Sequence, residues 1–343
     1  MQLAADGNLR NRELSPFIVD MENNGRLSNS GTFRTQPGDV EALVNLHIDE
    51  ARRRWGLGRN DAADVAVYAH GGLTDEDTAA KWIPKLYEAQ IFPVFFMWET
   101  DLWSTLGNRL EDLVKGLPKP TAGLIDQLSR FWNRRLERLL APAGSMIWGE
   151  MKQNADGISA FSQSGARILY DHASKSPGFA PFRVRLHLIG HSAGSIVHSY
   201  LIDRLGKLGW NFESVNFMAP AVTVELFRDK VLKRIQDGTV KQFRTFHLNE
   251  AAEQQDPTCR PILGYGRSLL YLVSESFENG ITTPILGIEK HFNEHIGVLK
   301  LKNVQSWSAP TTGVASSTTH GGFDDDEVAM QSVISLIKKN RLP

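Results

Sequence analysis

Cysteine is nearly absent from this sequence. Cys259 is the single cysteine among 343 residues, so the chain can form no internal disulfide and no cysteine-rich metal cluster. A chain of this kind fits a reducing compartment. The first residues also lack the basic and apolar regions of a secretory signal, and we therefore expect a cytoplasmic location.

An excess of one charge sign is lacking as well. The 38 Lys and Arg residues nearly balance the 39 Asp and Glu residues, for a formal net charge of −1. Such a balance leaves no overall positive field for nucleic acid, and we expect no nucleic-acid partner. No apolar run reaches the ~18 residues that a transmembrane helix needs, so we expect no stable membrane insertion. Nothing in the sequence indicates the oligomeric state.

What the sequence does contain is an alternation of short apolar runs with helical patterns. This alternation predicts an α/β fold with a mostly parallel central sheet and flanking helices. The six runs that predict strands are 64–69, 92–98, 183–189, 215–218, 241–248 and 303–308.

Three further segments have predicted structure. Residues 40–55 have an amphipathic helical pattern. Residues 324–340 predict a last helix, whose acidic first turn, starting at Asp324, suits the helix dipole. The turn signal Asn-Asn-Gly at 23–25 predicts an antiparallel pair formed by 17–21 and 31–35.

Residues 101–148 interrupt the alternation. Apolar side chains between Leu124 and Leu140 recur at helical spacing, with arginines on the opposite side. We interpret this segment as a helical cap, or lid, inserted into a single domain that spans residues 1–343. A plain surface helix pair and a membrane-surface helix are the alternatives.

The sharpest motif is G-x-S-x-G, formed by residues 190–194 around Ser192. Chance alone supplies roughly 0.2 such matches in a chain of this composition, so its context matters more than the pentapeptide. A predicted strand precedes the motif without a spacer and a helical pattern follows it. This order predicts a nucleophile elbow, with the Ala193 N–H at a helix N-terminus where it can bind an oxyanion.

With this motif in its context, the chain resembles the α/β-hydrolase superfamily of serine hydrolases, of the esterase and lipase kind. In that family the nucleophile follows the fifth strand, an acid usually follows the seventh, and a histidine comes last. The resemblance implies that His320, between the last predicted strand and the last helix, is the general base. It also implies a second oxyanion donor in the His70-Gly71-Gly72 loop, at the Gly72 N–H, with Gly71 or Leu73 as near alternatives.

The acid is less defined by the sequence. Three carboxylates follow the strand that ends at Leu248, and Asp256 is favoured because Asp-Pro suits a turn. Glu250, closer to the strand end, is the alternative acid, and Glu253 is third.

Residues near the motif are candidates for contact with substrate. His70, Gly71 and His191 adjoin the expected oxyanion site. Trp98 precedes the insertion and Trp103 lies in it, and both would line an aromatic acyl or alcohol pocket, although core packing is the more common role of tryptophans.

A competing motif concerns metal binding. His291, Glu294 and His295 match H-x-x-E-H, but a glycine soon follows, and we interpret the segment as a solvated surface turn. We expect neither a metal nor a cofactor.

The function that these residues predict is hydrolysis of a small-molecule carboxylic ester through a Ser-His-Asp triad and an acyl-enzyme. Amide or thioester hydrolysis would use the same triad. A partner-binding protein of the same fold, without catalysis, is the alternative from another class.

Overall fold

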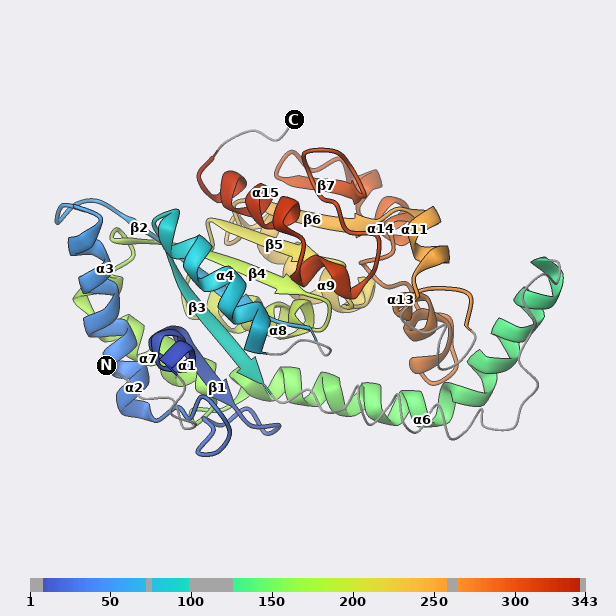
Figure 1. Cartoon of the computed structure of the whole chain (residues 1–343), viewed down its shortest axis with the longest axis horizontal. Helices are drawn as coiled ribbons and strands as arrows, with labels where there is room; N and C mark the ends of the chain where they lie inside the picture. Colours follow the sequence, from blue (N-terminus) through green and yellow to red (C-terminus); the bar gives the residue numbers. More distant parts are fainter. Residues whose placement is uncertain (1–8, 72–75, 99–125, 258–264, 340–343) are drawn as a thin grey trace.

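A computed structural model describes residues 9–71, 76–98, 126–257 and 265–339 of the chain. Its strands form one seven-stranded sheet in the order β1-β3-β2-β4-β5-β6-β7, and every neighbouring pair is parallel (Figure 1). The predicted α/β class with a parallel sheet is therefore confirmed. The strands are β1 (Ile18–Met21), β2 (Ala63–Ala69), β3 (Ile91–Trp98), β4 (Val184–His191), β5 (Ser214–Met218), β6 (Phe243–Leu248) and β7 (Val304–Ala309).

The predicted antiparallel pair near the N-terminus is wrong. Residues 18–21 instead extend the sheet as β1, which runs parallel to β3, and residues 31–35 form no strand. The turn signal itself was read correctly, because Gly25 has a φ of +75° and its N–H donates to the Glu22 carbonyl. The chain leaves this turn through a single antiparallel bridge between Met21 and Leu27. The long-range pairing of β1 with β3 prevails over the local hairpin.

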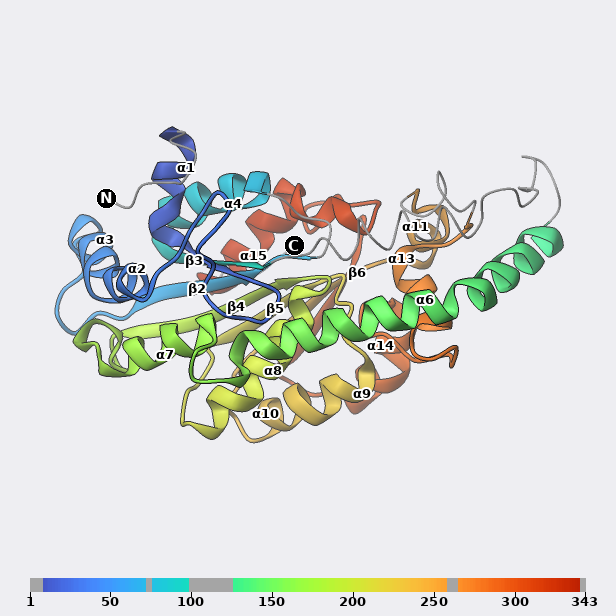
Figure 2. The same ribbon diagram turned by 90° about the horizontal axis from the view of Figure 1, so that it is seen from below.

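Helices cover both faces of the sheet (Figure 2). Helices α4 and α15 lie on one face, and α7, α8 and α10 lie on the other, with α6 crossing that second face. The helices are α1 (Leu9–Leu14), α2 (Pro37–Ala42), α3 (Ile48–Arg54), α4 (Glu76–Glu88), α6 (Asp126–Ala160), α7 (Gly165–Lys175), α8 (Gly194–Lys207), α9 (Val224–Phe227), α10 (Lys233–Gln236), α11 (Glu250–Gln255), α13 (Leu269–Leu272), α14 (Glu289–His295) and α15 (Glu327–Ile337).

Short 3₁₀ and π-helical turns adjoin several of these helices. The π-helical turns are η2 (Leu43–His47), η4 (Arg228–Leu232) and η5 (Val273–Phe277), and the 3₁₀ turns are η1 (Ser15–Phe17), η3 (Pro177–Phe179), η6 (Gly297–Leu299) and η7 (Gly321–Asp324). Because α2, η2 and α3 are continuous, the helix predicted for residues 40–55 is confirmed as helical from Pro37 to Arg54.

The described part of the predicted cap belongs to one long helix. Of residues 101–148, those from 126 onward are described, and they form the start of α6, which continues to Ala160. Trp132, Leu136 and Leu140 are buried at helical spacing, whereas Leu139 is 39% exposed. Helix α6 packs against α7, α8 and η5 and extends past the sheet on the side where the strands end (Figure 1).

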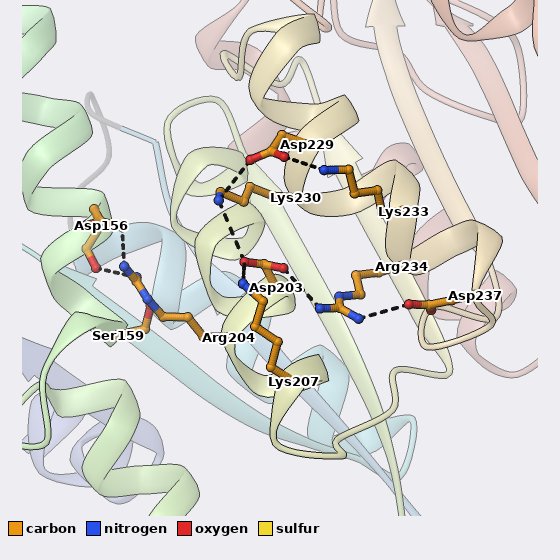
Figure 3. A network of polar contacts seen from close by, with 10 residues as sticks. All are labelled: Asp156, Ser159, Asp203, Arg204, Lys207, Asp229, Lys230, Lys233, Arg234 and Asp237. Atoms are coloured by element: carbon orange, nitrogen blue, oxygen red, sulfur yellow. Dashed lines mark hydrogen bonds and ion pairs between the residues drawn. The ribbon is translucent and has the colours of Figure 1, made fainter.

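Charged side chains orient α6 and α10 around α8 (Figure 3). Arg204 of α8 donates to the Asp156 carboxylate of α6, with a nitrogen–oxygen distance of 2.6 Å. Asp203 of α8 accepts from Arg234 of α10 and lies 3.7 Å from the ammonium nitrogen of Lys230 in η4. Partly exposed pairs contribute only about 0–1 kcal/mol each. They fix how the helices align, and the buried apolar side chains between them supply most of the stability.

The order of the strands reverses direction at the centre of the sheet. From β2 the chain crosses to β3 on one side, and from β4 it crosses to β5 on the other. Parallel sheets bind ligands at such a reversal point, outside the C-terminal ends of the strands. Here the two ends that meet are those of β2 and β4. No helix in the described part of the chain is long and apolar enough to cross a lipid bilayer.

Two glycines of α6 give a test of how closely this helix packs. A Cβ at Gly144 would lie 2.1 Å from the buried Phe277 ring of η5, whereas a Cβ at Gly149 meets nothing within 4 Å. We expect Gly144→Ala to lower the free energy of unfolding by about 1–3 kcal/mol through overpacking. Gly149→Ala, the matched control, should raise it by about 0.5–1 kcal/mol because alanine favours helix. Urea denaturation measures both, and equal effects of the two changes would contradict the packing.

Candidate active site

The G-x-S-x-G motif forms a sharp turn between β4 and α8. Strand β4 ends at His191, α8 begins at Gly194, and Ser192 between them has a φ of +49°. A non-glycine residue in this left-handed region carries strain of about 1–3 kcal/mol, which the surrounding structure must hold. The Ser192 N–H donates to the Met218 carbonyl of β5 over 3.0 Å, which helps to hold it.

Close approach explains both glycines of the motif. A Cβ at Gly194 would lie 1.9 Å from the carbonyl oxygen of Ala69, the last residue of β2. A Cβ at Gly190 would lie 3.1 Å from the backbone of Gly194 and from the His198 ring. The glycines therefore let the start of α8 sit directly on the end of β2, where no side chain fits.

The same contact brings the predicted oxyanion loop to the serine. A Cβ at Gly71, just after β2, would lie 2.9 Å from the Ser192 Cβ. Ala193 is the N-cap of α8, so its N–H lies at the positive end of the helix dipole. Gly72 and Trp103 lie outside the described residues.

His320 reaches Ser192 from the segment that follows β7. Its Nε2 lies 2.8 Å from the Ser192 Oγ, and the two residues are 1% and 3% exposed. Burial, followed by the nearby His191 ring, lowers the pKa of His320 to about 3. The imidazole is therefore neutral at pH 7 and can accept a proton from the serine hydroxyl.

Of the three candidate acids, Asp256 is the one that the structure places against His320. Its Oδ2 accepts from the backbone N–H of His320 over 3.3 Å, and the residue is fully buried. The Nδ1 of His320 is buried and makes no hydrogen bond to a described residue. The Asp256 carboxylate therefore contacts the backbone N–H of His320.

The other two carboxylates have different surroundings. Glu250 is exposed and accepts from the Tyr271 hydroxyl over 2.7 Å. Glu253 is buried and hydrogen-bonded to Ser268, and burial raises the pKa of Glu253 to about 8. Neither contact joins these residues to His320.

A second histidine, His191, pairs with an aspartate and contacts the backbone of His320. His191 Nε2 donates to the His320 carbonyl over 3.0 Å, and His191 Nδ1 lies 2.7 Å from Asp324 Oδ2. The hydroxyl of Tyr68, on β2, donates to the other carboxylate oxygen. Burial acts to lower the pKa of His191, but Asp324 outweighs it and raises that pKa. His191, expected to contact substrate, is thus a buried support for the His320 backbone.

The role predicted for Asp324 is accordingly corrected. It does not belong to the first turn of the last helix but to η7, and it is buried. Asp326 is the N-cap of α15, because its carboxylate accepts from the N–H groups of Val328 and Ala329. The sequence signal for Asp324 was an aspartate one helical turn after His320, which the acidic run obscured.

His70 and Trp98 contact each other. The Trp98 backbone N–H donates to His70 Nε2 over 3.3 Å, and the Trp98 indole donates to the His70 carbonyl over 3.2 Å. Both residues are buried. These hydrogen bonds join the ends of β2 and β3 beside Gly71.

The H-x-x-E-H segment is a helix rather than the surface turn that was expected. His291, Glu294 and His295 lie on α14, and His291 Nδ1 accepts from the Ile285 backbone N–H over 3.2 Å. The described ranges contain no group of three His, Cys, Asp or Glu side chains placed to hold a metal ion.

No protein-family model and no curated protein matches this chain. The chemistry of the site is therefore argued from its own residues.

The His191–Asp324 pair predicts a pH-dependent effect of Asp324→Asn. The folded pKa of His191 is raised, so its stabilisation is complete below about pH 6.5 and is lost as pH rises through the folded pKa. Against the opposing effect of burial, His191 and Tyr68 hold the pKa of Asp324 low, so its stabilisation is present above about pH 4 and is lost as pH falls further. Asp324→Asn should therefore lower the melting temperature most between about pH 4 and 6.5.

Asp325→Asn is the matched control for this measurement. The Asp325 carboxylate is exposed and pairs with Lys81 at the surface. Its loss should change the melting temperature little at any pH. A wild-type-minus-variant difference that does not vary with pH for Asp324→Asn, or that Asp325→Asn reproduces, would contradict the ion pair.

Proposed function

We propose that this protein is a serine hydrolase that cleaves carboxylic esters. One observation carries the proposal: Ser192 has a positive φ at the reversal point of a parallel sheet, with a neutral histidine nitrogen 2.8 Å from its hydroxyl oxygen. A serine placed in this way lies next to a base and to the N-terminus of a helix.

The order of the site residues supports an α/β-hydrolase fold. Relative to the strand that carries Ser192, Asp256 comes after the second strand further on, and His320 comes after the third and last. This is the relative spacing of nucleophile, acid and histidine in that family. The parallel edge strand β1 is a departure from it. We propose one such domain over residues 1–343, with residues 101–148 as a cap.

The proposed reaction begins at Ser192. His320 Nε2 takes the hydroxyl proton as the serine oxygen attacks the ester carbonyl, and it then gives that proton to the leaving alcohol. Water then attacks the acyl carbonyl as the same nitrogen takes its proton, and the Ser192 oxygen leaves with that proton as the acid is released. The Ala193 N–H would bind the oxyanion, with Gly72 as the second donor that the family resemblance implies. One such donor contributes about 10²–10³ to the rate.

Asp256 is the proposed acid. A carboxylate against the histidine fixes the tautomer in which Nε2 is free to accept a proton, and it stabilises the imidazolium. Its contact with the His320 backbone places it close enough for this role. The bond from His320 Nδ1 would form when the substrate complex tightens the site, as catalytic hydrogen bonds often do.

One observation favours a non-catalytic, partner-binding protein as the second candidate. The buried Nδ1 of His320 has no hydrogen-bond partner among the described residues. A triad without the hydrogen bond between its histidine and its acid is weakened by several orders of magnitude. The two experiments below distinguish a working triad from an inactive one.

Labelling with a fluorophosphonate probe tests the nucleophile. Wild-type protein should form a covalent adduct at Ser192, located by peptide mass mapping, because only a serine with a working base reacts readily. Ser192→Ala should lose both the adduct and ester turnover while keeping the wild-type melting temperature. Ser199→Ala, a control that changes another serine of α8, should still be labelled at Ser192. Ester turnover that survives in Ser192→Ala would overturn the proposal.

Paired substitutions test the acid. Asp256→Asn should lower kcat by about 10³–10⁴, since the amide no longer favours the reactive tautomer. Glu250→Gln should change kcat less than about twofold, because Glu250 contacts Tyr271 rather than His320. Steady-state kinetics on a short-chain ester measure both. The reverse ranking would assign the acid to Glu250, and full activity in both variants would exclude a carboxylate at either position.

A further inference from the structure

A pocket lies at the opposite edge of the sheet from Ser192, where strands β4 to β7 begin. Its volume is about 600 Å³, within the range that holds small molecules. The strands and the end of α15 line it with His187, Ser214, Arg244, Gln305, Trp307 and Ile337. None of these residues belongs to the proposed catalytic site.

Arg244 is the unusual member of this lining. It is paired in register with Asn216 of β5 and Gln305 of β7, so these side chains emerge on the same face of the sheet. Arg244 is only 8% exposed, yet its Nε and Nη1 are buried without a hydrogen-bond partner among the described residues. An unpaired buried charge is among the most costly arrangements in a protein interior.

The carboxylates near the pocket are already engaged. Glu213 pairs with Lys241 at 2.7 Å and with Lys339 at 3.3 Å. Asp64 pairs with Arg185 at 2.6 Å and with Lys338 at 3.1 Å. Four cations thus pair with these two carboxylates, whereas Arg244 forms no ion pair with a carboxylate among the described residues.

The other polar side chains that line the pocket carry no further negative charge. His187 uses Nδ1 on the Ser214 hydroxyl and Nε2 on Asp64. Gln242 and Gln305 also line the pocket, and a side-chain amide there can turn its N–H groups toward a ligand. The arginines of the network in Figure 3 differ from Arg244, because Arg204 and Arg234 are each paired with an aspartate.

We propose that this pocket binds a small organic anion through a carboxylate or phosphate group, with the Arg244 guanidinium as its main partner. The planar guanidinium presents N–H groups in a fork that matches two oxygens of such a group. Trp307, Leu336 and Ile337 supply an apolar wall for the rest of the molecule. The site is independent of the proposed hydrolase activity.

The experiment is a thermal-shift titration with inorganic phosphate and, separately, with benzoate, at constant ionic strength held with sodium chloride. A ligand that binds the folded state raises the melting temperature in a saturable way. Wild-type protein should show this rise with at least one probe, which also identifies the preferred oxyanion. Arg244→Met and Arg244→Gln should bind that probe at least about tenfold more weakly, because the charge-assisted hydrogen bonds are gone.

Arg204→Gln is the matched control, since its guanidinium is paired with Asp156 and lies outside the pocket. It should keep the wild-type response to the probe. Without any ligand, Arg244→Met should melt at or above the wild-type temperature, because it removes an unpaired buried charge and keeps an apolar stem. Absence of a saturable rise in the wild type, an undiminished rise in both Arg244 variants, or a clear loss of stability in ligand-free Arg244→Met would overturn the proposal.

Discussion

The contact between the end of β2 and the start of α8 is the constraint on which the site depends. Gly194 lies so close to the Ala69 carbonyl that a single added carbon would overlap it, and a carbon added at Gly71 would lie 2.9 Å from the Cβ of Ser192. These approaches force the chain to turn within two residues after β4 and leave Ser192 with a positive φ. The strain at Ser192 persists because the sheet on one side and α8 on the other leave the backbone no room to relax.

Burial lowers the pKa of two neighbouring histidines, but their partners shift the two pKa values in opposite directions. Among the described residues no carboxylate is hydrogen-bonded to the His320 ring, so desolvation lowers the pKa of His320 and keeps the ring neutral. His191 has Asp324 within 2.7 Å, and the carboxylate favours its charged form in spite of the burial. One imidazole is thereby suited to accept a proton, and the other is suited to hold a backbone carbonyl in place. The rings lie only 5.5 Å apart, so their difference comes from their partners and not from their depth.

Buried charged groups are paired differently at the two ends of the strands. At the C-terminal edge the buried polar groups around Ser192 are joined to one another through Tyr68, Asp324 and His191. At the N-terminal edge, Asp64 and Glu213 collect the neighbouring cations, and Arg244 remains without a counter-charge among the described residues. An unpaired buried charge opposes folding, and the proposed anionic ligand of the adjacent pocket would supply the counter-charge of Arg244.

The sequence by itself determined six of the seven strands, the mostly parallel class of the sheet and the strand–turn–helix around Ser192. Buried parallel strands are continuous apolar runs, and glycines at 190 and 194 are required by contacts close to them in the chain or at the neighbouring strand end. It could not determine that residues 18–21 join β3, that Asp256 rather than Glu250 lies against His320, or that Asp324 is buried under His191. Each of these depends on which segments meet across distances of 60 residues or more, and only tertiary packing decides that. The sequence gives the charge of a side chain, but the fold decides whether that side chain forms an ion pair. Arg204 pairs with Asp156, whereas Arg244 has no carboxylate partner among the described residues.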